Sequence, residues 1–265
     1  MGKSIMIGAR TELAVIVLAI VIIGLPIPLH PSSANAAHPE IGSTVAVKNR
    51  VTAELADEKR RLLKGAKVHQ DEILVTGAKS SAEIKLLDDT KLAVGPSARL
   101  VLDKFVYDAD APPKSISVTL AKGAFRFISG TSAKAAYEIR TPTATMGVRG
   151  TVFDVFVADN GESVVLLHEG SVDVCAGPSN CRRHDVIGKI MHIGLGGLLS
   201  EPANWNRSLI RGIRVTRAFP FVGRRLAIDP VRRLTHSALS RGRVDDVIRK
   251  PLDGLRELRR QLPFR

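Results

Sequence analysis

Short runs of alternating apolar and polar residues fill the middle of the chain. Each run is bounded by Gly, Pro, Asp or Asn, and a period of two places successive side chains on opposite faces of a strand. The pattern predicts an all-β domain of short strands over residues 41–181. The runs, in chain order, are STVAV, DEILV, AEIKLL, KLAV, ARLVL, SISVTL, AFRFI, YEIR, TVFDVFV, SVVLL and SVDVC.

Two pairs of runs predict hairpins. AEIKLLDDTKLAV has Asp88 and Asp89 at its turn, and VFVADNGESVVLL has Asp159-Asn160-Gly161 at its tip. The charged segment 54–64, ELADEKRRLLK, is compatible either with one or two turns of helix or with a strand pair interrupted by a charged loop.

The chain also contains an internal echo. SVTLAKGAFRF (117–127) resembles SVVLLHEGSVDV (163–174), because both have an apolar strand, a polar pair, a glycine and a second alternating strand. The echo predicts stacked hairpin units, arranged either as a short β-solenoid or as a β-sandwich of two sheets. Two copies do not decide between these arrangements.

Charge divides the chain into two parts. Residues 1–181 hold 20 Lys/Arg and 19 Asp/Glu, a net of +1, whereas residues 182–265 hold 19 and 7, a net of +12. We therefore expect a basic, partly helical or disordered C-terminal extension at 182–265, with a helix near 251–262. Leucines at helical spacing support that helix. They are Leu252, Leu255, Leu258 and Leu262.

The N-terminus has the features of a secretory signal. Lys3 and Arg10 precede an uncharged apolar run at 13–25, and Ala34-Asn35-Ala36 forms an A-x-A cleavage site. Residues 1–36 are thus predicted to be a signal peptide cleaved before Ala37, or else an uncleaved anchor. The protein is expected to be periplasmic or secreted, or anchored in the inner membrane if the signal is retained.

The two cysteines, Cys175 and Cys181, are predicted to form a disulfide. They flank a Gly-Pro-Ser-Asn turn sequence, and an exported protein lies in an oxidising compartment. Their spacing does not suit zinc, and His184 would add only one ligand, so no metal is expected.

The stretch TPTATMGVRGTVFDV, at residues 141–155, is unusually rich in Thr and Gly. Glycine suits positive φ or close backbone approach, and Thr suits a half-buried strand, so we predict a tight corner between the strands YEIRTPTAT and TVFDVFV. Pro142 is expected at a strand edge or a bulge. Phe153 and Val155 should face one side, with Asp154 and Phe156 on the other. The candidate motif residues are Thr141, Pro142, Gly147, Arg149, Gly150, Thr151 and Phe153.

Arg149 has two interpretations. Its guanidinium either satisfies carbonyls at the corner or pairs with Asp154 or another acid, or it contacts an acidic partner or ligand.

Five motifs in order give residues 68–176 a resemblance to the FecR domain, named for the ferric citrate regulator. They are VHQDEILVTGAKSSAEIKL, LLDDTKLAVGPSARLVL, LAKGAFRF, TPTATMGVRGTVFDV and HEGSVDV. The resemblance implies an all-β domain in the bacterial periplasm without enzymatic activity. In the best-known members, a cytoplasmic helical segment holds a sigma factor, and the outer β-domain receives a signal from an outer-membrane receptor. Only residues 1–12 precede the apolar run here, so the anti-sigma role is not carried over.

The sequence shows little catalytic chemistry. HExxH, GxSxG, GxxxxGK[ST], GxGxxG and SxxK are absent from the sequence. The adjacent acids Asp71-Glu72 and Asp88-Asp89 are interpreted as solvated turns rather than acid/base pairs. Two carboxylates from distant strands could still perform glycoside chemistry. We expect no enzymatic activity and no cofactor.

The predicted function is that of an exported FecR-domain protein acting as an envelope interaction or signal-sensing module. The alternatives are a membrane-anchored component of a transmembrane signalling system, or an envelope polysaccharide-binding protein. The expected partner is an envelope protein. The C-terminal arginines suit an anionic lipid or an acidic polysaccharide, and nucleic acid is not expected outside the cytoplasm.

Overall fold

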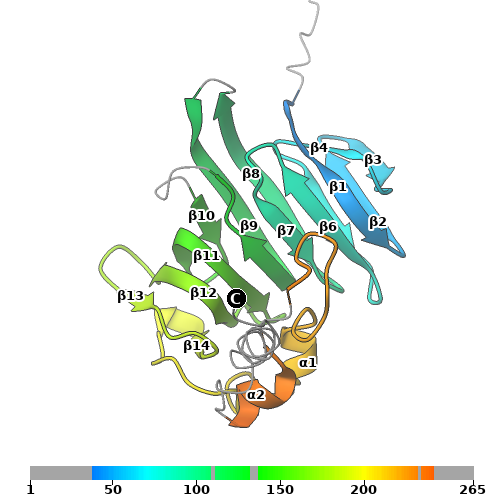
Figure 1. Cartoon of the computed structure of the whole chain (residues 1–265). Helices are drawn as coiled ribbons and strands as arrows, with labels where there is room; N and C mark the ends of the chain where they lie inside the picture. The colour runs from blue at the N-terminus through cyan, green and yellow to red at the C-terminus, as the bar shows by residue number, and fades with distance from the viewer. Residues whose placement is uncertain (1–37, 109–110, 132–136, 232–233, 242–265) are drawn as a thin grey trace, which may run out of the picture. The chain divides into compact units, whose positions relative to one another are not determined.

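A computed structural model describes residues 38–108, 111–131, 137–231 and 234–241 (Figure 1). The predicted signal peptide at 1–36 and the predicted helix near 251–262 lie outside these residues. In the described part of the chain, no helix has the length and apolar character needed to cross a membrane.

The all-β prediction is confirmed, because one hydrogen-bonded network joins 14 strands. The network divides into two layers that share their longest strands. Strands of the first layer, in order of pairing, are β4 (Lys67–His69), β1 (Glu40–Lys48), β6 (Ser81–Leu86), β7 (Lys91–Val94), β9 (Ala111–Ile128), β11 (Thr145–Val157), β12 (Ser163–Cys175) and β14 (Ile190–Ile193). The second layer contains the other halves of β9, β11 and β12. Its remaining strands are β3 (Glu58–Arg61), β2 (Val51–Leu55), β5 (Ile73–Thr76), β8 (Arg99–Asp108), β10 (Tyr137–Arg140) and β13 (Cys181–His184).

Both predicted hairpins are present, as β6–β7 and β11–β12. The charged segment 54–64 is a strand pair and not a helix, because β2 and β3 pair in antiparallel register across a short turn.

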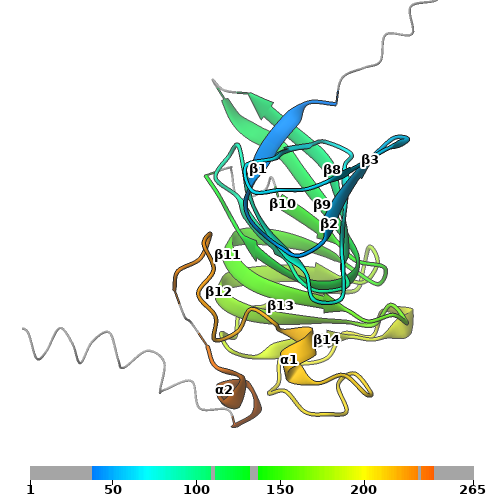
Figure 2. The ribbon, with the colours of Figure 1, turned by 90° about the vertical axis from the view of Figure 1, so that its right-hand side faces the viewer.

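The three long strands pass from one layer to the other at glycines with positive φ. These are Gly123 in β9 (φ 92°), Gly150 in β11 (φ 58°) and Gly170 in β12 (φ 78°). A Cβ on Gly170 would lie 2.4 Å from the carbonyl oxygen of Gly150, so two corners meet where β11 and β12 pair. Figure 2 shows β11 and β12 as curved ribbons. The internal echo therefore corresponds to two long strands, each with a glycine at its bend.

Hydrophobic side chains fill the core between the two layers. Alternate residues of the first layer, including Phe125, Phe127, Phe153 and Val155, pack against residues of the second layer such as Tyr137. The rings of Phe127 and Tyr137 meet edge to face with centroids 5.4 Å apart. As predicted, Phe153 and Val155 lie on one face of β11, whereas Phe156 belongs to a separate cluster on the other face.

The β-structure continues past residue 181. β13 and β14 pair with β12, and residues 203–231 and 234–241 then cross the outer face of the first layer. We call these two stretches the strap. It contains the short helices α1 (Val215–Ala218) and α2 (His236–Arg241), and η1 (Leu195–Gly197) precedes it.

The strap is anchored by apolar side chains. Trp205 and Phe219 pack edge to face at 5.8 Å, and the Trp205 amide donates to the Leu239 carbonyl over 2.9 Å. The strap residues of this cluster contact Ala124, Phe156, Val164, Leu166 and Ile190 of the sheet. The described residues of 182–241 are thus packed on the β-domain.

Candidate functional site

The motif residues Thr141 and Pro142 lie in the turn between β10 and β11. The amide of Thr141 donates to the Ala144 carbonyl over 2.8 Å, and its hydroxyl accepts from the Ala144 amide over 3.1 Å. Pro142 is exposed in this turn. The prediction that it sits at a strand edge or a bulge is therefore wrong, because the change of direction between the two strands occurs at residues 141–144.

Gly147, Gly150, Thr151 and Phe153 all lie within β11, so the predicted corner is a bend inside one strand and not a junction between two. The pairing of β11 with β12 shifts register between Arg149 and Val152, which marks a β-bulge. Thr151 secures the bend, since its hydroxyl donates to the Ser171 carbonyl over 2.7 Å and its amide to the Ser129 hydroxyl over 2.8 Å.

Arg149 lies at this bulge, and its side chain is outside what the structure describes. The carboxylate of Asp154 pairs with a different arginine, Arg126 of β9.

Arg126 is the centre of a buried ion network on the outer face of the first layer. Its Nε donates to Asp154 Oδ1 over 2.6 Å and its Nη2 to Asp154 Oδ2 over 2.9 Å. His168 Nε2 lies 3.1 Å from Asp154 Oδ2, and Asp229 Oδ2 accepts from Arg126 Nη1 over 3.1 Å. All four side chains are at most 3% exposed. Three come from β9, β11 and β12, and the fourth comes from the strap.

The network holds Asp154 and Arg126 in their charged forms. Burial alone would raise the pKa of Asp154, but the charges of Arg126 and His168 and their hydrogen bonds hold that pKa well below its usual range. Burial likewise opposes the charge of Arg126, and the carboxylates of Asp154 and Asp229 outweigh it and raise the pKa of the guanidinium. Because each charge has a partner, the burial is tolerated.

The strap closes over this network. The ring of Phe221 lies 5.9 Å from the guanidinium carbon of Arg126, and the Ile228 amide donates to Glu83 Oε2 over 3.0 Å. The sequence analysis missed the network. The available signal was that Arg126, Asp154 and His168 each follow apolar runs at positions facing away from the core.

Two acids interpreted as solvated turn residues are in fact buried. Glu72 accepts from Arg60 Nη2 over 2.6 Å and from the His69 amide over 3.1 Å. Asp88 accepts from the Thr90 hydroxyl over 2.7 Å and from the Tyr137 hydroxyl over 2.9 Å. Both acids hold turns to neighbouring strands, so the solvated interpretation is wrong for them.

Four loops gather near the turn at residues 141–144. We call residues 141–144, 158–162, 175–181 and 194–199 the loop cluster. The Thr143 hydroxyl donates to the Gly161 carbonyl over 3.3 Å, and a Cβ on Gly161 would lie within 4 Å of both Pro142 and Leu195. Leu195 and Leu198 are 59% and 70% exposed there.

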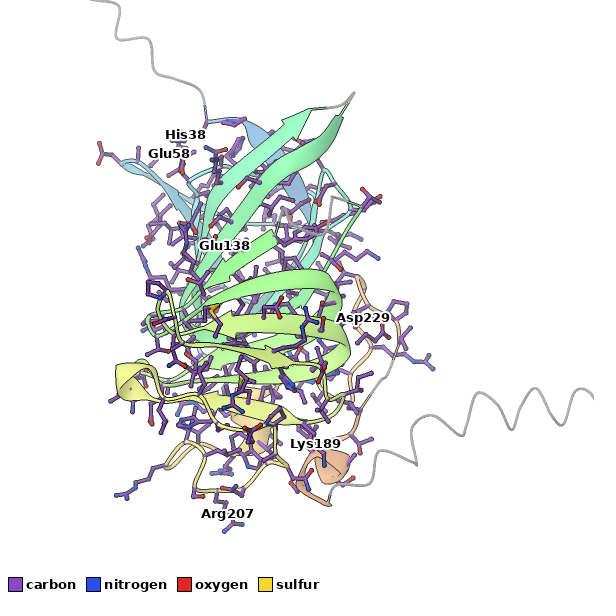
Figure 3. All side chains as sticks on the ribbon, turned by 90° about the vertical axis from the view of Figure 1, so that its left-hand side faces the viewer. His38, Glu58, Glu138, Lys189, Arg207 and Asp229 are labelled. Atoms are coloured by element: carbon purple, nitrogen blue, oxygen red, sulfur yellow. A yellow bond between two sulfur atoms is a disulfide. The ribbon has the colours of Figure 1, made fainter. Side chains whose placement is uncertain are left out.

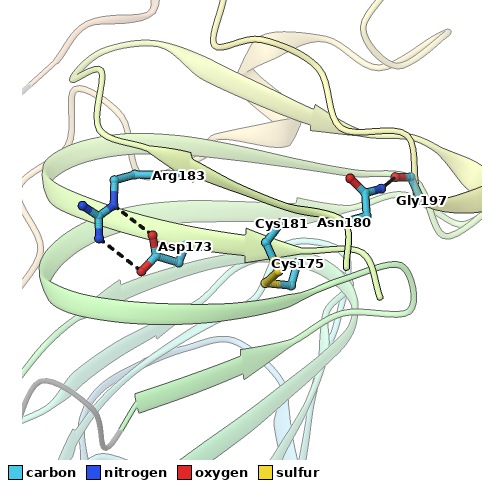
Figure 4. Close-up of a disulfide and its surroundings, with 6 residues drawn as sticks. All are labelled: Asp173, Cys175, Asn180, Cys181, Arg183 and Gly197. Atoms are coloured by element: carbon cyan, nitrogen blue, oxygen red, sulfur yellow. Dashed lines mark hydrogen bonds and ion pairs between the residues drawn. A yellow bond between two sulfur atoms is a disulfide. The ribbon is translucent and has the colours of Figure 1, made fainter. Parts of the chain in front are cut away.

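The predicted Cys175–Cys181 disulfide is confirmed and fixes one of these loops (Figure 4). Beside it, the side-chain Nδ2 of Asn180 donates to the Gly197 carbonyl over 2.6 Å, and Arg183 pairs with Asp173 across β12 and β13. The loop that carries Leu195 and Leu198 is thereby tied to the disulfide loop.

The described residues contain no group of three or more His, Cys, Asp or Glu that could hold a metal ion. They form an all-β domain with paired charges under a strap and an exposed, cross-linked loop cluster. Residues 72–173 match the family model described as FecR protein, and the resemblance stated from the ordered motifs is thereby confirmed.

Solved structures similar to the chain include two crystal structures, at 1.65 and 2.50 Å resolution, titled as "a putative anti-sigma factor from Parabacteroides distasonis ATCC 8503". Each is 15% identical with a TM-score of 0.39, and the match covers 48% of this chain and 57% of that chain. The match thus spans little more than half the length of those proteins. No curated protein sequence matches the chain.

The family match supports a signalling-related module. The FecR family is regulatory, and its domains are typically associated with the periplasm or the cell envelope.

Proposed function

We propose that this chain is a non-enzymatic, exported FecR-domain protein that binds an envelope protein and acts as an interaction or signal-sensing module. The observation that carries the proposal is the FecR match over residues 72–173. That segment contains β5 to β11 and most of β12, which include all the long strands shared by the two layers.

The buried network of Arg126, Asp154, His168 and Asp229 supports a role without catalysis, because its acids and its histidine are buried between the strap and the sheet. A general acid or base must come within hydrogen-bond reach of a substrate. Asp154 and His168 are each about 1% exposed, and the strap covers the network they belong to. These groups therefore stabilise the attachment of the strap to the sheet.

The loop cluster is the surface that best suits a protein partner. Leu195 and Leu198 expose apolar side chains on a loop that is tied to a disulfide-linked hairpin. A loop held in one conformation loses little entropy on binding, and burial of exposed leucines contributes apolar contact area. We assign the docking of an envelope protein to this cluster.

The test is site-directed cross-linking in cells that produce the full-length chain, with Leu195→Ser/Leu198→Ser against Leu63→Ser. Leu63 is 60% exposed and lies outside the loop cluster, so it is a matched control. We expect one envelope protein to be cross-linked by the wild type and by the Leu63 variant, with strong loss in the double variant. Equal capture by all three chains would contradict this docking surface.

Export itself is tested by N-terminal sequencing of the protein from the envelope fraction. We expect a mature N-terminus at Ala37. A retained segment 13–25 would instead make the same module a membrane-anchored component of a signalling system.

A further inference from the structure

The outward side of the strap is strongly basic. Between residues 203 and 241 the sequence has Asp229 as its one acid, and that carboxylate is buried against Arg126. The buried apolar side chains of the strap pack on the sheet, and its arginines are left at the surface. The exposed arginines of the described strap are Arg207, Arg211, Arg214, Arg217, Arg224 and Arg225.

Some of these arginines line a cleft of about 850 Å³ in the strap itself. One wall runs from Trp205 to Arg207 and the other from Gly212 to Thr216, and Ser240 of α2 adds a hydroxyl. Figure 3 shows Arg207 projecting away from the ribbon. The cleft combines two guanidinium groups, Thr216 and Ser240 hydroxyls, and apolar surface from Ile213 and Val215.

This combination suits a polymer that carries both carboxylates and hydroxyls. A guanidinium fork pairs with a carboxylate through two parallel hydrogen bonds. Thr and Ser hydroxyls donate to and accept from sugar hydroxyls, and the apolar wall can cover the C–H face of a sugar ring. A flat anionic membrane surface would not need a hollow, since arginines on a convex surface serve it equally well.

We propose that this cleft binds an acidic polysaccharide, with Arg207 and Arg214 pairing with its carboxylates. The other strap arginines extend the positive surface on either side and attract the polymer over a longer range. The inference rests on the proposed function, because export places the strap beside envelope glycans.

The experiment titrates the purified full chain with polygalacturonate and, as a neutral control, with dextran. The chain has a single tryptophan, Trp205, and it lies in the cleft wall, so its fluorescence reports occupancy directly. The variant is Arg207→Gln/Arg214→Gln. Its matched control is Arg224→Gln/Arg225→Gln, which removes the same charge from the same strap outside the cleft lining.

We expect polygalacturonate to change the Trp205 fluorescence and dextran to leave it unchanged. Loss of two charge-assisted contacts should weaken binding by roughly 10- to 100-fold in the Arg207/Arg214 variant. The Arg224/Arg225 control should weaken binding by only a few-fold. Circular dichroism of each variant verifies that it is folded.

Three results would overturn the inference. The first is equal weakening in both double variants, which means that net charge alone binds the polymer. The second is equal binding of dextran. The third is tighter binding to vesicles of phosphatidylglycerol and phosphatidylcholine than to polygalacturonate, which assigns the strap to a lipid surface. Cross-linking through Leu195 and Leu198 does not use this cleft, so its outcome judges the proposed function separately.

Discussion

The two faces of the first layer are buried by different means. The inner face packs against a second sheet through apolar side chains such as Phe125, Phe127 and Phe153. The outer face is covered by the irregular strap, and between its apolar residues it holds the network of Arg126, Asp154, His168 and Asp229. Sheet packing of this kind tolerates almost any apolar residue of the right size.

The strap has no regular alternation of apolar residues that could pack on the sheet in the way that a second sheet does. A bidentate pair between Arg126 and Asp154 demands specific geometry, and Asp229 can complete it only when the strap lies in one position. We therefore interpret the inner face as the source of most stability, and the network as the feature that sets the position of the strap. Fixed positioning matters because the strap carries the basic cleft.

The largest expected effects come from one substitution on each face. Arg126→Ala should destabilise the protein by about 3–5 kcal/mol, because it leaves two buried carboxylates without their main partner. Phe127→Ala should cost a similar amount, about 3–5 kcal/mol, by opening a cavity. Urea unfolding measures both.

A combined replacement then distinguishes the two faces. Arg126→Met/Asp154→Leu/Asp229→Leu should recover most of the stability lost in Arg126→Ala, because a buried ion network can often be replaced by apolar residues of similar volume. The strap, however, should be less well positioned, and amide hydrogen exchange at 219–229 should be faster than in the wild type. An Arg126→Ala variant that loses less than about 1 kcal/mol would contradict the buried pairing.

The next effect concerns the glycine corners that decide which layer each half-strand joins. Gly170→Val should cost roughly 2–5 kcal/mol, because its Cβ would lie 2.4 Å from the Gly150 carbonyl oxygen and its φ is 78°. Gly150→Val meets no atom within 4 Å but keeps a φ of 58°, so its cost is about 1–2 kcal/mol of backbone strain.

Gly147→Ala is the matched control in the same strand. Its nearest neighbour, the Asp173 Cβ, would lie 4.0 Å from the new methyl group, so a neutral or slightly stabilising change is expected. Thermal unfolding of the three variants gives the order. Equal losses at Gly147 and Gly170 would show that the bend does not depend on glycine.

The structural features that depend on local sequence pattern could be predicted from the sequence. Alternation located β1, β5 to β12 and both hairpins, although it divided β9 and β12 into two short strands each. It also correctly separated Phe153 and Val155 from Phe156. Turn chemistry and an exported setting predicted the Cys175–Cys181 disulfide. Glycine content pointed to a corner near Gly150, although the corner lies within β11 rather than between two strands.

The strap and its network could not be predicted in the same way. Polar residues that alternate with apolar ones, such as Arg126 and Asp154, indicate a solvent-facing side unless a distant segment is known to cover them. The strap shows no period because Trp205, Phe219 and Leu239 are buried individually rather than along one regular face. Arginines dominate the composition of the strap, and they indicate only the character of its solvent-facing side. A boundary drawn after residue 181 from charge therefore falls inside β13 and separates most of β13 and all of β14 from their partner β12.

The smallest expected effect is a difference in acid sensitivity between the two faces. The pKa of Asp154 is lowered on folding, so the unfolded chain, with a pKa of about 3.9, binds the proton first as the pH falls. The stability that this carboxylate contributes is therefore complete above roughly pH 5 and is lost as the pH falls towards its folded pKa.

Asp154→Asn should remove that part of the dependence of the unfolding free energy on pH. Phe127→Leu, on the inner face, should lower stability at every pH and leave the slope unchanged. Asp159→Asn, at an exposed hairpin tip, controls for the loss of one charge. Burial also lowers the pKa of His184, so its contribution to stability falls as the pH drops below about 6.5. His184 is present in the wild type and in every variant, so its contribution cancels when their slopes are compared. If Asp154→Asn and Phe127→Leu keep the same slope as the wild type, the network is not ionised in the folded protein. The contrast between the two faces would then be one of shape rather than of charge.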